Sequence, residues 1–73
     1  MKLKAKEPFS IIVGSTVQDP NGKSLQVKAG QEFEAQDTTT WSSNVWITFD
    51  NIRGKRECGT WRNLVNNGYA DIV

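Results

Sequence analysis

The chain has 73 residues, no histidine, one cysteine, three tryptophans and a formal net charge of +1. This length predicts one small domain. The near-neutral net charge excludes a strongly basic tail and an acidic mimic of nucleic acid, and a lone cysteine excludes an intrachain disulfide framework. Histidine is the commonest general base and metal ligand, so its absence argues against most enzymes and most metal sites.

Residues 1–7 are polar and rich in lysine, and we expect them to be flexible. The apolar run that follows, residues 9–13, is too short for a secretory signal, and no stretch approaches the ~20 apolar residues of a membrane span. With Cys58 unable to pair within the chain, these features predict a cytoplasmic protein that does not associate with membranes.

Alternating apolar residues predict a first strand over Phe9–Val17 and a second over residues 25–29. Between them, Pro20 and the pair Asn21-Gly22 are typical of a tight hairpin turn. A third strand is expected over residues 32–36, where interleaved polar residues predict a solvated face.

Residues 45–50 predict a fourth strand, with Val45, Ile47 and Phe49 on one face. We expect the segment DNIRGK to turn the chain and residues 56–61 to form a fifth strand. A single helical turn is predicted over residues 61–66, with Thr60 as its cap, followed by a sixth short strand over residues 69–73.

Five or six short strands at this spacing predict an all-β domain spanning residues 1–73. We expect the sheet to close into a small barrel, because closure removes aggregation-prone edges.

From residue 28 on, the order of features resembles that of bacterial Src-homology-3-like (SH3-like) domains. The segment KAGQEFEAQD is similar to a strand opening of that family, VWITFDNIRGKRECGTW to its central hairpin, and WRNLV to the single helical turn before its last strand. The resemblance implies an SH3-like barrel. Residues 13–27 lack the family's opening signature, so the family's cell-wall or peptide-binding site is not carried over to this chain.

The reactive side chains predict no enzyme, no cofactor and no metal site. Cys58 follows Lys55 and Arg56, which would favour a thiolate, but a lone cysteine in a strand more simply acts as a small apolar residue. Glu32 and Glu34 share one strand face, where acidic residues more simply keep the surface solvated.

The three tryptophans are candidate contacts. Trp46 has the opposite parity to Val45 and Ile47, so it either points outward as a binding anchor or packs beneath the N-terminal segment. Trp41, in a polar loop, either contacts a partner or covers the core. Trp61 is expected in the core.

Basic residues gather at the predicted hairpin tip, where we expect Arg53, Lys55 and Arg56 to project, with Arg62 nearby. Three interpretations of such a tip are open: a solvated turn without a partner, a contact for nucleic acid, or a contact for an acidic protein. Our prediction is a non-enzymatic protein-binding module that uses these cations with Trp41 and Trp46.

Two alternatives remain open at this point. One is a nucleic-acid-binding barrel that uses the same residues, and the other is a subunit of a homo-oligomer. A compact module of this kind suggests a small regulator or inhibitor. Small proteins encoded by phages or mobile elements often look this way, but nothing in the sequence assigns that origin.

Overall fold

The computed structural model describes residues 1–14, 18, 22–37 and 43–73. In this part of the chain it contains seven strands and one helix, which confirms the all-β class. In chain order the elements are β1 (Lys2–Ala5), β2 (Phe9–Val13), β3 (Lys23–Val27), β4 (Glu32–Asp37), β5 (Asn44–Phe49), β6 (Ile52–Glu57), α1 (Trp61–Asn66) and β7 (Ala70–Ile72).

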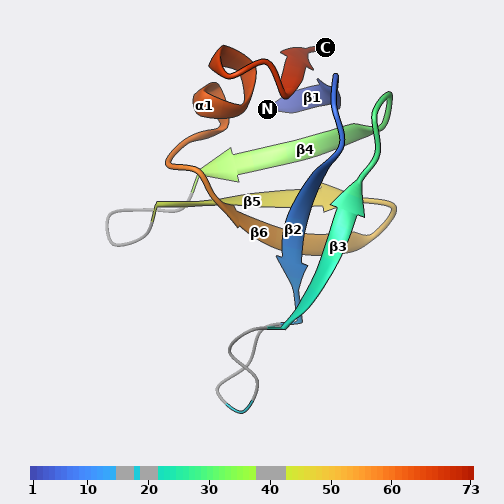
Figure 1. Ribbon diagram of the computed structural model, residues 1–73, viewed down its shortest axis with the longest axis vertical. Coiled ribbons are helices and arrows are strands. Elements are labelled where there is room, and N and C mark those ends of the chain that lie inside the picture. The colour runs from blue at the N-terminus through green and yellow to red at the C-terminus, as the bar shows by residue number, and fades with distance from the viewer. Residues whose placement is uncertain (15–17, 19–21, 38–42) are drawn as a thin grey trace.

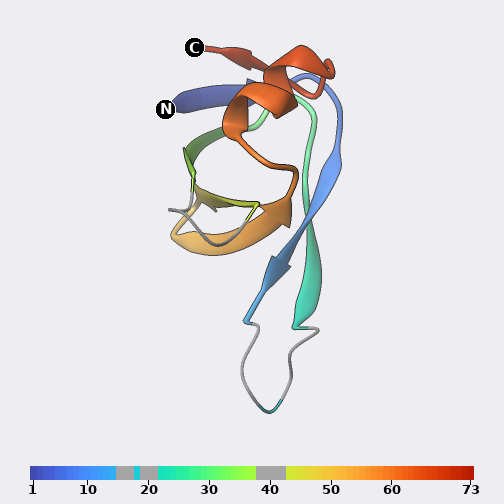
Figure 2. The same ribbon diagram turned by 90° about the vertical axis from the view of Figure 1, so that its left-hand side faces the viewer.

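The strands form one antiparallel sheet in the order β3-β2-β6-β5-β4-β1-β7. The sheet curls strongly, and the β2–β3 hairpin extends away from the end of the molecule that holds α1 and both termini (Figures 1 and 2). Strands β3 and β7 stand at the two ends of the described sheet and do not pair, so these strand pairs do not close a barrel.

The start of the chain is ordered, and the expectation of a flexible segment over residues 1–7 is wrong for β1. Leu3 and Ala5 are buried and alternate with exposed lysines, which gives β1 the inward–outward pattern of a half-buried strand. Strand β1 lies between β4 and β7 and pairs with both. It is the additional strand that raises the number from the predicted five or six to seven in the described chain.

The core lies on the concave side of the sheet and is made almost wholly of residues of one parity. The predicted inward faces of β4 and β5 are confirmed, because Phe33, Ala35, Val45 and Ile47 are all buried. Strand β2 stops at Val13, earlier than predicted. The predicted turn residues Pro20 and Asn21 lie outside the described residues. The buried set is Leu3, Ala5, Phe9, Ile11, Val27, Phe33, Ala35, Val45, Ile47, Phe49, Leu64 and Ala70.

The turn between β5 and β6 is tighter than the sequence suggested. Asp50 and Asn51 both have positive φ angles, 49° and 63°, as the two central residues of a type I′ hairpin turn require. The chain is therefore already in β6 at Ile52, and Arg53, Lys55 and Arg56 lie along a strand. The prediction of a projecting basic tip is wrong.

Gly54 allows β2 to cross closely over β6. The two strands pair only at Ile12–Lys55 and Val13–Gly54 before they separate. A Cβ atom at Gly54 would lie 2.6 Å from Ile11 Cδ1 and 2.9 Å from the Ile12 carbonyl oxygen, closer than such atoms approach. The absence of a side chain at this position is therefore what permits the crossing.

The predicted helical turn is confirmed as α1, with Leu64 packed into the core. Thr60 occupies the N-cap position, but its side chain makes no capping hydrogen bond. Instead Asp37 Oδ1, from β4, accepts a hydrogen bond of 2.7 Å from the Trp61 backbone N–H. This bond satisfies one of the free backbone donors at the start of the helix and ties α1 to β4. No helix in the described chain is long and apolar enough to cross a membrane.

Candidate functional site

The convex face of the sheet carries Trp46 near its centre. Trp46 pairs with Gln36 on β4 and with Lys55 on β6, and Lys55 in turn pairs with Ile12 on β2. In antiparallel strands, directly paired residues point to the same side, so these four side chains form one row across the outside. Ile12 is 38% exposed although it is a large apolar residue. We call Ile12, Gln36, Trp46, Arg53 and Lys55 the outer face.

Arg53 lies over the indole ring of Trp46. Its guanidinium carbon is 4.4 Å from the ring centroid, within cation–π distance. Arg53 pairs directly with Thr48 and so is the diagonal neighbour of Trp46, within reach of a long side chain. Trp46 is half-buried and points away from the core, which agrees with the outward alternative of the two that the sequence left open.

Arg56 belongs to the other side of β6. It pairs with the fully buried Val45, and its guanidinium carbon lies 5.3 Å from the centroid of Phe9 and 5.1 Å from that of Tyr69. Its Nη1 donates a hydrogen bond of 2.9 Å to the Ser10 carbonyl. The structure therefore does not bring Arg56 together with Arg53 and Lys55, and makes it a bridge between β6 and β2.

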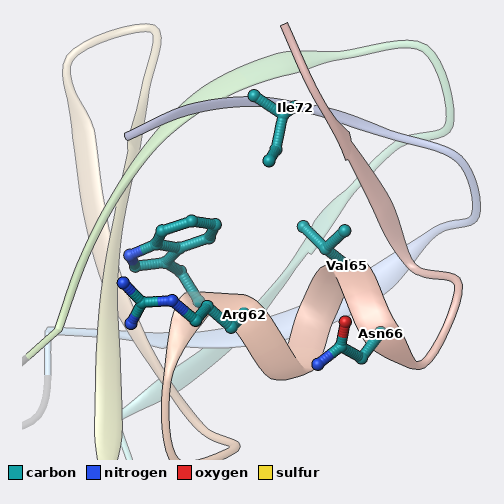
Figure 3. A pocket seen from close by; sticks show the side chains of 5 residues that line it. Arg62, Val65, Asn66 and Ile72 are labelled. Carbon is teal, nitrogen blue, oxygen red and sulfur yellow. The ribbon is translucent and has the colours of Figure 1, made fainter.

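Arg62 is also separate from the outer face, because it lies on α1. Its guanidinium carbon is 4.7 Å from the ring centroid of Trp61. Together with Val65, Asn66 and Ile72 these two residues line a hollow of about 230 Å³ between α1 and β7 (Figure 3). Trp61 is half-buried and packs against the core, so the expected core position holds for only part of its ring.

Trp41, the remaining predicted contact, lies outside the described residues. Of the six residues predicted to form one binding surface, the structure places Trp46, Arg53 and Lys55 together and places Arg56 and Arg62 elsewhere. Sequence reasoning did not include Ile12 in the candidate surface, although its parity, opposite to Phe9 and Ile11, was the signal that it faces outward.

Cys58 is poorly suited to nucleophilic attack. Burial raises the pKa of its thiol above the ordinary value, and the opposing effect of Arg56 is smaller. Its Sγ lies 3.8 Å from the Thr60 carbonyl oxygen, a weak hydrogen bond that keeps the proton on sulfur. At neutral pH the residue is therefore a neutral thiol and not the thiolate that chemistry at Cys58 would need.

The paired glutamates of β4 lie on the convex side and make surface ion pairs. Glu32 Oε1 is 3.5 Å from Lys2 Nζ, and Glu34 Oε1 is 2.9 Å from the N-terminal amino group. No group of three or more acidic or cysteine side chains in the described ranges is placed to hold a metal ion. These carboxylates thus connect β1 to β4 at the surface.

No family model matches the chain, and comparisons with curated proteins and with solved structures find no significant match. The case for a function therefore depends on the outer face and on the hollow beside α1.

Proposed function

We propose that this protein is a non-enzymatic binding module that holds a partner protein on its outer face. The observation that supports this most directly is the position of Trp46, a large ring on the convex side of the sheet with Arg53 stacked on it. Tryptophan and arginine are the residues that most often dominate protein interfaces, because both combine apolar contact with directed hydrogen bonds.

The partner in this proposal presents an apolar side chain flanked by carboxylates. Ile12 and Trp46 supply apolar area on the outer face, and Arg53 and Lys55 supply the cations beside it. Stacking on the indole holds the Arg53 guanidinium in place, so less side-chain entropy is lost when it binds a carboxylate.

The distribution of charge favours a protein over a nucleic acid. Only two of the four predicted cations, Arg53 and Lys55, lie on the outer face. Two acidic residues, Glu34 and Glu57, lie on the same side of the sheet in neighbouring strand pairs. Binding to phosphates draws its affinity from several cations acting together, and the outer face holds only two.

The same proposal interprets the curled sheet as a variant of the SH3-like barrel. Strands β4, β5 and β6 form a continuous meander, and the single helical turn α1 leads into a last strand that pairs with the first. We propose that it serves as a small cytoplasmic regulator or inhibitor, in line with its free cysteine.

The test is a pull-down from a bacterial lysate, with and without nuclease treatment, that uses four immobilised proteins. The wild type and Lys28→Glu, a charge reversal away from the outer face, are expected to retain the same stoichiometric partner. Trp46→Thr, which keeps a strand-forming residue, and the double variant Arg53→Glu/Lys55→Glu are expected to lose it.

The melting temperature of each variant shows whether a lost partner reflects a missing contact or an unfolded protein. Retention of the partner by all four proteins would exclude the outer face as the site. Recovery only of nuclease-sensitive material, with an affinity that falls steeply with salt, would assign the outer face to nucleic acid. A dimeric mass for the wild type that Trp46→Thr abolishes would assign it to a second copy of the chain.

A further inference from the structure

The concave face of the sheet is left uncovered at one corner. Ile72 lies on the same side of β7 as Ala70 and pairs directly with Leu3. Both of those neighbours are fully buried, whereas Ile72 is 57% exposed. The Ile72 side chain thus belongs to the apolar face of the sheet but is exposed to solvent, because no described residue covers it fully.

The open corner is the hollow between α1 and β7. Val65 and Ile72 face one another across it, from the helix and the strand respectively (Figure 3). Its volume of about 230 Å³ is below the roughly 300–1,000 Å³ of sites for small organic ligands. The hollow suits one apolar side chain better than a complete small molecule.

A cation stands at the edge of this hollow. Arg62 is stacked on Trp61, and no carboxylate of the described residues lies within ion-pair distance of it. A guanidinium that is held by stacking and lacks an acidic partner is suited to bind a carboxylate from outside.

The backbone of β7 offers a third contact. Val73 N–H donates to the Lys2 carbonyl, and the Tyr69 carbonyl accepts from Lys6 N–H, so the odd-numbered residues here bond to β1. Because bonding alternates along an antiparallel strand, the N–H and C=O of Ile72 point to the other side. That side is the end of the described sheet, and neither Figure 1 nor Figure 2 shows a strand beyond it.

We propose that the hollow between α1 and β7 binds an extended segment of an acidic partner protein, added as a strand beside Ile72. One apolar side chain of the segment enters the hollow, and a carboxylate two residues away pairs with Arg62. The spacing follows from the strand, since alternate residues point to the same face. The partner motif is therefore an apolar residue and an acidic residue separated by one position, in either direction.

This second surface is independent of the outer face. Trp46 and Arg53 lie on the convex side, whereas Ile72 has the parity of the concave side. The two proposals can therefore fail separately.

The experiment titrates the ¹⁵N-labelled full chain with capped peptides and follows its NMR signals. The probes are TTLTETT and its reverse TTETLTT, with TTATETT and TTLTKTT as controls. We expect saturable shifts of the Trp61 indole, Val65 and Ile72 with a leucine–glutamate probe, and none at Trp46. The alanine control is expected to lose binding, and the lysine control to bind about three- to fivefold more weakly.

A charge reversal gives the decisive comparison. Arg62→Glu removes a surface cation without touching the core, and we expect it to reverse the order, so that TTLTKTT binds more tightly than TTLTETT. Loss of binding to all probes with an unchanged spectrum of the free variant would contradict the charge pairing. No shifts with any probe, or shifts at the outer face alone, would overturn the proposal. Shifts at Ile72 that grow with protein concentration in the absence of peptide would assign the hollow to a second copy instead.

Discussion

Strand β6 carries two arginines three residues apart, Arg53 and Arg56, and the sheet sends them to opposite sides. Arg53 covers Trp46 on the convex face, where its charge is available to a partner. Arg56 lies over Phe9 and Tyr69 and bonds to the Ser10 carbonyl, and its Nε is buried without a hydrogen-bond partner in the described chain. An odd spacing in a strand thus places Arg53 on the outer face and Arg56 against the aromatic rings of the inner side.

The separation arises where β2 leaves β6. The two strands pair at Gly54 and Lys55 only, so beyond that point the gap between them has no ladder hydrogen bonds. Arg56 fills this gap and supplies a bond to β2 in place of the missing backbone pairs. The inner side of β6 is therefore expected to control stability, and the outer side to control binding.

Gly54→Ala tests the inner side with the largest expected effect. The added Cβ would meet the Ile12 carbonyl oxygen at 2.9 Å, and a backbone atom cannot move aside as the end of a side chain can. We expect a loss of about 1–3 kcal/mol in the free energy of unfolding, measured by urea denaturation. Arg53→Ala, on the outer side of the same strand, is the control and should change it by less than about 0.5 kcal/mol. Equal stability of the two variants would mean that β2 does not cross at Gly54.

Arg56→Ala is the second test and compares the two arginines directly. It removes the bond to Ser10 and the stacking on two rings, so we expect unfolding to become easier by about 1–2 kcal/mol. Arg56→Lys should recover only part of this loss, because an ammonium lacks the planar surface that stacks. If Arg53→Ala were as destabilising as Arg56→Ala, the distinction between the two sides of β6 would be lost.

Asp37→Ala tests how α1 is fastened to the sheet. Its carboxylate accepts the Trp61 N–H, so the variant should lose about 1 kcal/mol of stability, the usual cost of removing a helix cap. Thr60→Ala is the matched control, and it should be nearly neutral because the Thr60 side chain makes no capping bond. A larger loss from Thr60→Ala than from Asp37→Ala would reverse this assignment.

The smallest expected effect is the pH dependence contributed by Cys58. Burial raises the pKa of its thiol in the folded state, so the unfolded chain releases this proton first as pH rises. Below about 8.5, the pKa of the thiol in the unfolded chain, the thiol is protonated in both states and the free energy of unfolding does not depend on its titration. As pH rises from there to the higher pKa of the folded state, the free energy of unfolding falls.

Cys58→Ala removes this contribution, and the difference between its unfolding free energy and that of the wild type should shrink above about pH 8.5. Alkylation of the folded wild type should be slow at neutral pH for the same reason. Rapid alkylation at pH 7 would show that the thiol is exposed and ionised.

Much of the architecture follows from local alternation in the sequence. The alternation in residues 32–36 and 45–50 predicted which residues of β4 and β5 are buried, and the spacing of Trp61, Leu64 and Val65 predicted α1. The same rule applied to Lys2–Ala5 would have found β1, but the polar, lysine-rich composition of residues 1–7 led to the expectation of a flexible segment. The early turn at Asp50-Asn51 was missed because neither residue is glycine, although both adopt positive φ.

The sequence by itself determined the strand class, the helical turn and the placement of Trp46 on the opposite side of its strand from Val45 and Ile47, because these depend on residues one to four positions apart. Only the tertiary structure decided that Arg56 leaves the basic cluster, that Asp37 caps α1 and that Ile72 remains uncovered. Each of those results depends on which distant strands lie side by side, and residue order along one strand does not contain that information.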